Sequence, residues 1–172
     1  GSFEENIDCS TNSCNFNIFI SKFNKDGVFQ WVKEFGNDKN SSANSIKTDS
    51  NDNLFITGLT TGSFSGYKNE GMGDIFLIKL NKTGEKIWLK QTGSVFDDSS
   101  NNLLLDNDNI LITGTYYDEV NQNALLIKFD NNGKKLWSKK WGTSNIDEGQ
   151  SVASDSKGNV FVTGSTMGSF AF

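Results

Sequence analysis

The stretch 81-NKTGEKIWLKQTG-93 decides the fold, because its spacing of Gly, Trp and Gly occurs three times in the chain. The same pattern is present in 24-NKDGVFQWVKEFG-36 and in 130-DNNGKKLWSKKWG-142. A catalytic loop is rarely written three times in one chain, whereas a stacked structural unit recurs at a regular period. The repetition therefore indicates a repeat architecture rather than a single active site.

Several anchor residues recur at nearly constant offsets around this stretch. Each copy has a lysine inside an apolar run, a Gly five residues later, a Trp nine later and a second Gly fourteen later. An Asp follows the second Gly by thirteen residues, and a Thr-Gly pair follows the Asp. The anchors are Lys22, Lys79 and Lys128; Trp31, Trp88 and Trp137; Gly36, Gly93 and Gly142; and Asp49, Asp106 and Asp155.

The segments between the anchors are typical of short β-strands. Runs such as 54-LFITG-58, 75-IFLIKL-80 and 160-VFVTG-164 are rich in Ile, Val, Phe and Thr. Clusters of Asn, Asp and Gly separate them, and these residues tolerate the left-handed conformation that hairpin turns require. In the most complete copy the pattern predicts antiparallel strands at 43–49, 53–60, 74–81 and 85–91.

A repeated unit of four strands and roughly 50 residues is the pattern of a β-propeller blade. We therefore predict an all-β chain of four-stranded antiparallel sheets, with about three repeats. The recurring Trp is expected on the outermost strand, where its ring fills the wedge between neighbouring sheets. The chain is expected to be one propeller segment over 1–172, with outer strands of a first blade at 1–40, blades at 41–92 and 93–142, and inner strands of a last blade at 143–172.

Three blades are too few for a ring, since propellers have about four to eight. We therefore expect this segment to be part of a larger propeller that supplies the remaining blades. The alternative is a ring of six blades completed by a second copy of the chain, because exposed strand edges invite pairing. Gly1 and Ser2 fit either native repeat or a cloning scar, since GSF also occurs at 62–64 and 168–170.

The composition excludes several classes of function. The chain has 172 residues, 35% of them hydrophobic, and a net charge of −5. This acidic balance argues against a nucleic-acid partner, and no apolar run is long enough for membrane insertion. The chain contains no His, which excludes Ser-His-Asp and Cys-His catalysis.

The two cysteines lie close together in 9-CSTNSC-14. Their spacing is not that of a CxxC redox motif, and two thiols are too few for a closed zinc site. Cys9 and Cys14 are either unpaired loop residues or the partners of a local disulfide, and a disulfide would point to an oxidising compartment.

The unit 74-DIFLIKLNKTGEKIWLKQTGSVFDDSSNNLLLDNDNILITGTY-116 resembles the SBBP repeat, a β-propeller repeat of bacterial surface and secreted proteins. The first copy departs from the family's pattern with Ser41 in place of a turn Asp, which predicts a missing or water-filled cap there. The residues that match are Asp74, Lys79, Gly84, Gly93, Asp98, Asp106 and Thr113-Gly114 in the second copy, and Lys128, Gly133, Gly142, Asp147, Asp155, Gly158-Asn159 and Thr163-Gly164 in the third.

The acidic turns are candidates for a calcium site, because Asp and Asn oxygens suit that ion. They lack the Gly and the bidentate acid of an EF-hand loop, so we interpret them as hairpin loops and expect no cofactor, with calcium as the alternative. The pairs Asp97-Asp98 and Asp147-Glu148 are interpreted as turn caps rather than as acid–base pairs. The calcium candidates are Asp49, Asp52, Asp106 and Asp108.

Tyrosines in the loops of variable length are the candidate ligand-binding residues. Tyr67, Tyr116 and Tyr117 fall there, and loops on a rigid scaffold are where binding residues usually lie. Tyrosine rings stack well on sugars and on partner proteins. The recurring lysines could form a positive ring for an anionic ligand, but a lysine inside an apolar strand more often extends to the edge or pairs with an acid.

The resemblance implies a non-enzymatic scaffold of a bacterial cell-envelope or extracellular protein, used for protein–protein contact or adhesion. A lectin-like binder of glycans on the cell surface, using loop aromatics and Asp or Asn, is the alternative. The segments 82-KTGEKIW-88 and 131-NNGKKLW-137 also resemble the Trp-bearing turn of PQQ-type propellers, which leaves an oxidoreductase fragment as a third hypothesis. No residue of this chain can be assigned to a quinone or calcium pocket of that kind.

Overall fold

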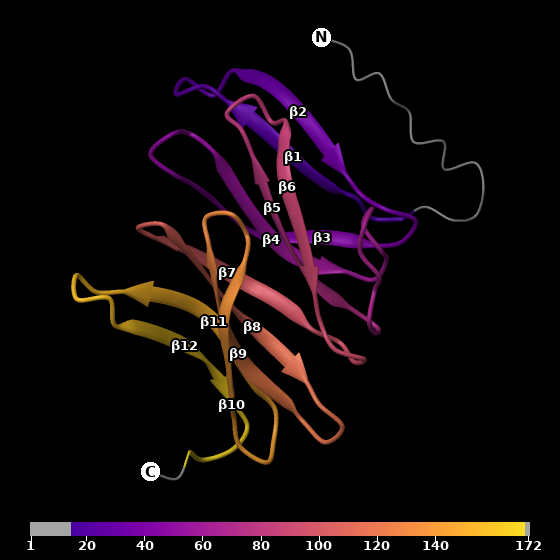
Figure 1. The fold of residues 1–172 in the computed structure, drawn as a ribbon, viewed down its shortest axis with the longest axis vertical. Helices are drawn as coiled ribbons and strands as arrows, with labels where there is room; N and C mark the ends of the chain where they lie inside the picture. Colours follow the sequence, from indigo (N-terminus) through magenta and orange to yellow (C-terminus); the bar gives the residue numbers. More distant parts are fainter. Residues whose placement is uncertain (1–14, 171–172) are drawn as a thin grey trace.

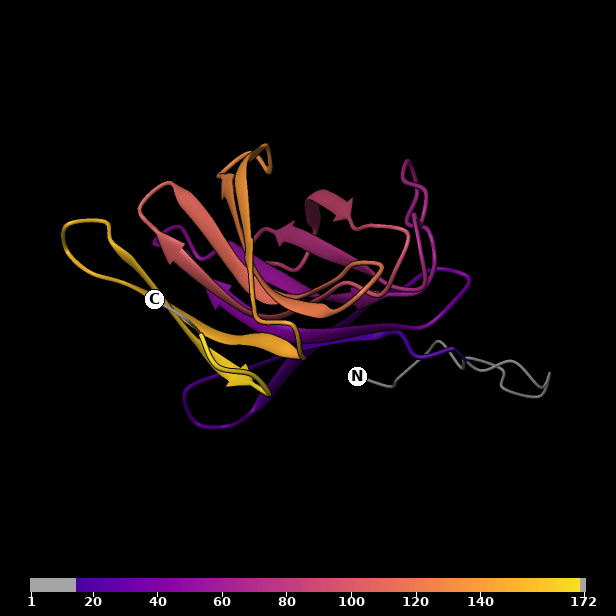
Figure 2. The same ribbon diagram turned by 90° about the horizontal axis from the view of Figure 1, so that it is seen from below.

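The computed structural model describes residues 15–170, and these consist of β-strands and loops. The strands pair antiparallel in four successive sheets that fan out along the chain (Figures 1 and 2). Within the described range no helix of the length and hydrophobicity of a membrane span is present. The predicted all-β fold of antiparallel four-stranded sheets is therefore confirmed. Cys9, Cys14, Gly1 and Ser2 lie outside the described residues.

Two of the sheets have four strands and two have two strands, and each follows the order of the chain. The first half-sheet consists of β1 (Ile18–Phe23) and β2 (Phe29–Phe35). The first full sheet contains β3 (Ser41–Thr48), β4 (Leu54–Thr60), β5 (Asp74–Leu80) and β6 (Lys86–Thr92). The second full sheet contains β7 (Ser99–Asp106), β8 (Asn109–Tyr117), β9 (Gln122–Asp130) and β10 (Lys135–Trp141). The last half-sheet consists of β11 (Asp147–Ser154) and β12 (Val160–Thr166).

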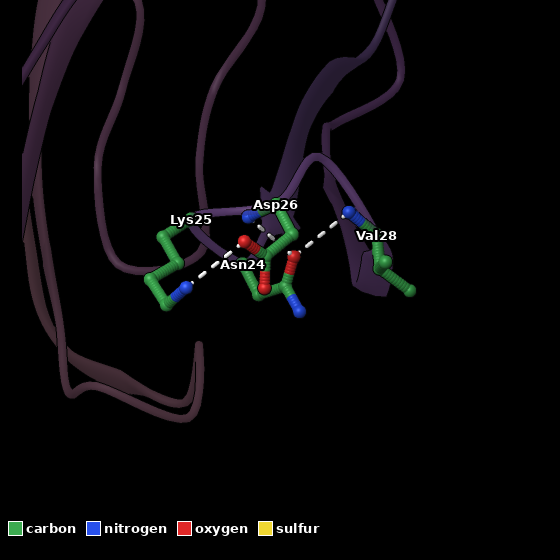
Figure 3. A network of polar contacts seen from close by, with 4 residues as sticks. All are labelled: Asn24, Lys25, Asp26 and Val28. Atoms are coloured by element: carbon green, nitrogen blue, oxygen red, sulfur yellow. Dashed lines mark hydrogen bonds and ion pairs between the residues drawn. The ribbon is translucent and has the colours of Figure 1, made fainter.

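The turn between β1 and β2 shows how the polar clusters make hairpins (Figure 3). The Asn24 Oδ1 atom accepts hydrogen bonds from the backbone N–H groups of Asp26 and Val28, at 3.0 and 2.8 Å. Gly27 follows with a φ of +78°, which a residue with a side chain would resist. Lys25 and Asp26 form an exposed ion pair at 2.9 Å, which contributes little to stability. The equivalent turns use Asn81 with Gly84 and Asp130 with Gly133.

The recurring tryptophans lie on the outermost strands and fill the wedges between sheets, as predicted. Trp88 on β6 packs against the core between the two full sheets, and its ring meets that of Phe55 edge-on at 6.1 Å. Trp31 packs between the first half-sheet and the first full sheet. Trp137 packs in the core that includes Leu111 of the second full sheet and Val152 of the last half-sheet. Each junction between sheets therefore contains one of the three recurring Trp rings.

The first copy has Ser41 where the other copies have a capping aspartate. The Ser41 hydroxyl is buried and lies 2.9 Å from the Thr60 hydroxyl. Asn37 Nδ2 donates to the same Thr60 oxygen, and Asn37 Oδ1 accepts from the Lys39 N–H, as the hydroxyls of Ser94 and Thr143 do in the other copies. Ser41 is too short to reach the Asn37 N–H as the aspartates reach their loops, so a missing or water-filled cap at this position stays a prediction.

The innermost strands of neighbouring sheets are joined by asparagine side chains. Asn44 on β3 donates to the Ser100 carbonyl on β7 at 2.8 Å. Asn101 on β7 donates in the same way to the Gly149 carbonyl on β11 at 3.0 Å. These two bonds join β3 to β7 and β7 to β11, so the first strands of three successive sheets lie next to one another.

Candidate functional site

A groove of about 330 Å³ opens where the beginnings of β7, β9 and β11 meet the ends of β4 and β8. Antiparallel pairing brings these termini to the same end of the sheets, although they are far apart in the sequence. The functional groups in the groove wall belong to Asp97, Tyr117, Gln122 and Glu148, and Leu59 adds an apolar contact.

Hydrogen bonds hold the groove residues in place. Gln122 Nε2 donates to Glu148 Oε1 at 2.9 Å, which ties the second full sheet to the last half-sheet across the groove. The Tyr117 ring lies 6.3 Å from the ring of Phe96, measured between centroids, and remains partly exposed. Backbone pairing between Gly73 and Asp97 anchors the other wall. The groove therefore presents one aromatic ring and two carboxylates on a rigid frame.

Asp98 holds the backbone of one groove residue in place. It is buried, its Oδ2 accepts from the Ser94 N–H, and its Oδ1 accepts from the Tyr117 N–H at 3.3 Å. Burial raises the pKa of the Asp98 carboxyl above its ordinary value, although these hydrogen bonds act in the opposite direction. Asp98 thus fixes the backbone that carries Tyr117.

The acidic pairs divide between two roles. Asp147 Oδ2 accepts hydrogen bonds from the N–H and the hydroxyl of Thr143, so Asp147 caps its loop in the same way as Asp98. Their neighbours Asp97 and Glu148 face the groove instead. The interpretation of both pairs as turn caps is therefore right for one member of each pair.

The structure does not bring the three candidate tyrosines together. The Tyr67 hydroxyl donates to the Leu89 carbonyl at 3.0 Å, so Tyr67 fastens its own loop to β6. Tyr116 packs against the core, and the Lys140 ammonium lies 2.9 Å from its ring centroid. Tyr117, the next residue, lines the groove, because successive residues of a strand point to opposite faces.

The recurring lysines differ in exposure. Lys79 is buried, and its Nζ donates to Asn131 Oδ1 at 2.6 Å in the β9–β10 turn. The same ammonium lies 4.9 Å from the Phe55 ring centroid. Lys22 is exposed and Lys128 is half-buried. Lys79 therefore links two sheets, in agreement with a local structural role.

The calcium candidates lie in hairpin turns. Asp49 Oδ1 accepts from the N–H groups of Asn51 and Asn53, both at 2.9 Å, and its Oδ2 accepts from the Asn53 amide. Burial opposes ionisation of Asp49, but the hydrogen bonds from Asn53 and Asn51 outweigh it and lower the pKa. In residues 15–170 no three Asp, Glu, His or Cys side chains gather as a metal site. Asp52 lies in the same turn as Asp49, and Asp106 and Asp108 lie at the turn between β7 and β8. Calcium binding in these turns stays the alternative to the prediction of no cofactor.

Sequence reasoning did not single out Gln122 or identify Asp97 and Glu148 as groove residues. A signal was available, because these positions differ between the copies whereas the anchors do not. Residues that vary on a constant frame are where binding specificity usually lies. By offset from the anchors, Asp97 corresponds to Asn40 and Ile146, and Glu148 corresponds to Ser42 and Ser99.

The comparison with protein families gives two matches. The family described as SBBP, beta-propeller repeat, matches residues 30–65 and 136–171. The two segments begin 106 residues apart, which is also the separation of Lys22 and Lys128. Each runs from an outermost strand, β2 or β10, through the two innermost strands of the following sheet. Comparison with curated proteins gives no match.

Proposed function

We propose that this chain is a non-enzymatic interaction module that binds a partner protein through the groove around Tyr117. Two of its segments match the SBBP beta-propeller repeat. The observation that carries this proposal is that the recurring and the non-recurring carboxylates have different roles. Those that recur, such as Asp98 and Asp147, cap turns. Those that do not recur, Asp97 and Glu148, line a single groove beside Tyr117. A constant frame with variable groups in one place is the arrangement of a binding scaffold.

The charge of the groove defines the partner that we propose. Asp97 and Glu148 supply two carboxylates in a chain with a net charge of −5. Complementary charge favours a protein segment that carries Lys or Arg, whose stem can lie on the Tyr117 ring. The family's association with surface and secreted proteins supports a place in the bacterial envelope or outside the cell. In the organism that makes the protein, we expect it in the envelope fraction or the medium, and accumulation in the cytoplasm would contradict this.

A peptide library displayed on phage tests the proposal. We expect enrichment of sequences with Lys or Arg, whose binding weakens about tenfold or more in Tyr117→Ala and in Glu148→Gln. Ile87→Ala serves as the control, because Ile87 is exposed on β6, away from the groove. Binding that is unaffected by both groove substitutions would contradict the proposal. A robust hydrolytic or redox activity of the pure protein would contradict its non-enzymatic part.

Carbohydrate binding is the second candidate, favoured by the composition of the groove. Tyr117 offers a ring face, and Gln122 and Glu148 offer planar polar groups that hydrogen-bond sugar hydroxyls. A glycan array with and without calcium separates the two functions. Specific glycan binding that is lost in Tyr117→Ala, together with a blank peptide library, would favour the lectin-like role.

A further inference from the structure

The two half-sheets expose apolar side chains at positions that are buried in the full sheets. Phe19 on β1 is 71% exposed, and Phe161 on β12 is 59% exposed. By offset from the anchors, Phe19 corresponds to Phe76 and Phe161 corresponds to Phe55. Phe76 and Phe55 are fully buried. The half-sheets therefore have the side chains of a complete blade without its neighbouring strands.

The half-sheets are complementary in strand role. In both full sheets the second strand pairs with the third, β4 with β5 and β8 with β9. β12 contains the Thr-Gly pair that lies on the second strand of each full sheet, so β12 corresponds to a second strand. β1 contains the lysine that lies on the third strand, so β1 corresponds to a third strand. In the described chain β12 pairs with β11, and β1 pairs with β2. Among the strands of residues 15–170, none pairs with the edge of β12 that would receive a third strand or with the edge of β1 that would receive a second strand.

Each half-sheet already occupies the place of a blade. Ile18 and Ile20 of β1 pack in one cluster with Ile56 and Phe76 of the first full sheet. Val152 of β11 packs with the second full sheet. The half-sheets lie apart from each other, with β1 and β2 at the top of Figure 1 and β11 and β12 at its lower left. Closing them on each other would give three blades, which is below the range of about four to eight that propellers use.

We propose that two copies of this chain join through these edges, β12 of each with β1 of the other, and close a ring of six blades. A two-fold axis makes the two junctions identical, as in most homodimers. Each junction completes one blade, buries Phe19 and Phe161, and removes two open strand edges. The assembly goes beyond the proposed function, because it does not depend on what binds in the groove.

The full sheets predict the register of the new junction. Phe55 is opposite Lys79 in the first full sheet, and Leu111 is opposite Lys128 in the second. Both pairs have the same offsets from the anchors, so the register is constant in the two blades. Transferred to the junction, this register places Phe161 opposite Lys22, Val162 opposite Ser21, and Gly164 opposite Phe19.

Thiol cross-linking tests this register in the whole chain. Cys9 and Cys14 are first replaced by serine, and Ser21→Cys is then combined with Val162→Cys. We expect mild oxidation or a short bifunctional thiol reagent to give a dimer with two cross-links, because opposite residues have Cβ atoms about 5 Å apart. The matched control combines Ser21→Cys with Phe161→Cys. It should stay uncross-linked, since a shift of one residue turns the side chain to the other face.

The native mass supplies an independent measurement. Light scattering should give a dimer for the unmodified chain, and Phe19→Asp should weaken dimerisation about tenfold or more while the circular dichroism spectrum is retained. Val120→Asp is the control, since Val120 is exposed in the β8–β9 loop. A monomer at all concentrations would overturn the proposal, and so would an intramolecular cross-link or a ladder of linked species above the dimer. A dimer that binds no peptide or glycan would contradict the proposed function alone.

Discussion

The hydroxyl of Thr57 on β4 lies 2.7 Å from the hydroxyl of Ser100 on β7, and this contact joins the two full sheets inside their buried interface. Thr57 donates to the Phe76 carbonyl at 2.7 Å, and the Ser100 hydroxyl also lies 3.1 Å from the Gly58 carbonyl. The two hydroxyl groups therefore satisfy backbone carbonyls inside the interface between the two sheets. This relationship makes the junction sensitive to changes of a few atoms.

Ser100→Ala removes one hydroxyl from this junction. We expect the free energy of unfolding to fall by about 1–2 kcal/mol, because buried acceptors lose a donor. Urea unfolding measures the change. Ser156→Ala, at an exposed position in the β11–β12 turn, should leave the midpoint unchanged. Equal midpoints for both variants would show that the Ser100 hydroxyl adds nothing to stability.

Gly149→Ala tests the corresponding contact at the next junction. A methyl group at Gly149 would lie 2.2 Å from the Thr113 Oγ1 atom, which donates to the Leu125 carbonyl. We expect a loss of about 1–3 kcal/mol from overpacking. Combining Gly149→Ala with Thr113→Ala should cost less than the sum of the two single changes, because the clash is removed. Simple additivity in the thermal or urea unfolding data would argue against the clash.

Trp88→Ala should destabilise the junction between the full sheets. The ring contacts Phe55 and the surrounding core, so its removal leaves a cavity that the rigid sheets cannot close. We expect a loss of about 3 kcal/mol, and a smaller loss for Trp88→Phe, which keeps an aromatic ring. Denaturant unfolding followed by circular dichroism measures both. A larger loss for the phenylalanine variant than for the alanine variant would contradict the packing role.

The carboxyls of Asp98 and Asp155 should titrate on opposite sides of the ordinary aspartate value. Burial raises the pKa of Asp98, whereas the side-chain amide and the N–H of Asn159 lower the pKa of Asp155. The native state therefore holds the Asp98 proton more tightly than the unfolded state, and this contribution to stability is lost as the pH rises above the ordinary value. Asp155 stabilises the fold above the ordinary value, and that contribution is lost as the pH falls through its lowered pKa.

Carboxyl titrations by NMR measure these two pKa values directly. Unfolding at several pH values then compares the chain with Asp98→Asn, whose stability relative to the unmodified chain should improve as the pH rises above the ordinary aspartate value. Asp155→Asn should show the opposite trend, with its largest deficit above that value and the smallest in acid. A single common pKa for both carboxyls would contradict the environments seen in the structure.

The hairpins and the wedge tryptophans could be predicted because their causes are local. Asn24 and Gly27 shape a turn within five residues, and the same chemistry recurs in each copy. The strand boundaries of the first full sheet lie within two residues of those expected. The groove could not be predicted in this way. Gln122 and Glu148 are 26 positions apart and meet only because two sheets are stacked.

The sequence by itself determined the blade: the strand positions, the turns and the place of the Trp, since runs of β-forming residues and short-range turn chemistry specify all three. Only the tertiary structure decided which residues serve a site. In the folded chain Tyr116 packs against the core, whereas Tyr117 lines the groove. The capping carboxylates of Asp98 and Asp147 are likewise separated from those of Asp97 and Glu148, which line the groove. The physical reason is that a side chain's environment depends on the sheet packed against it, and that contact comes from strands distant in the chain.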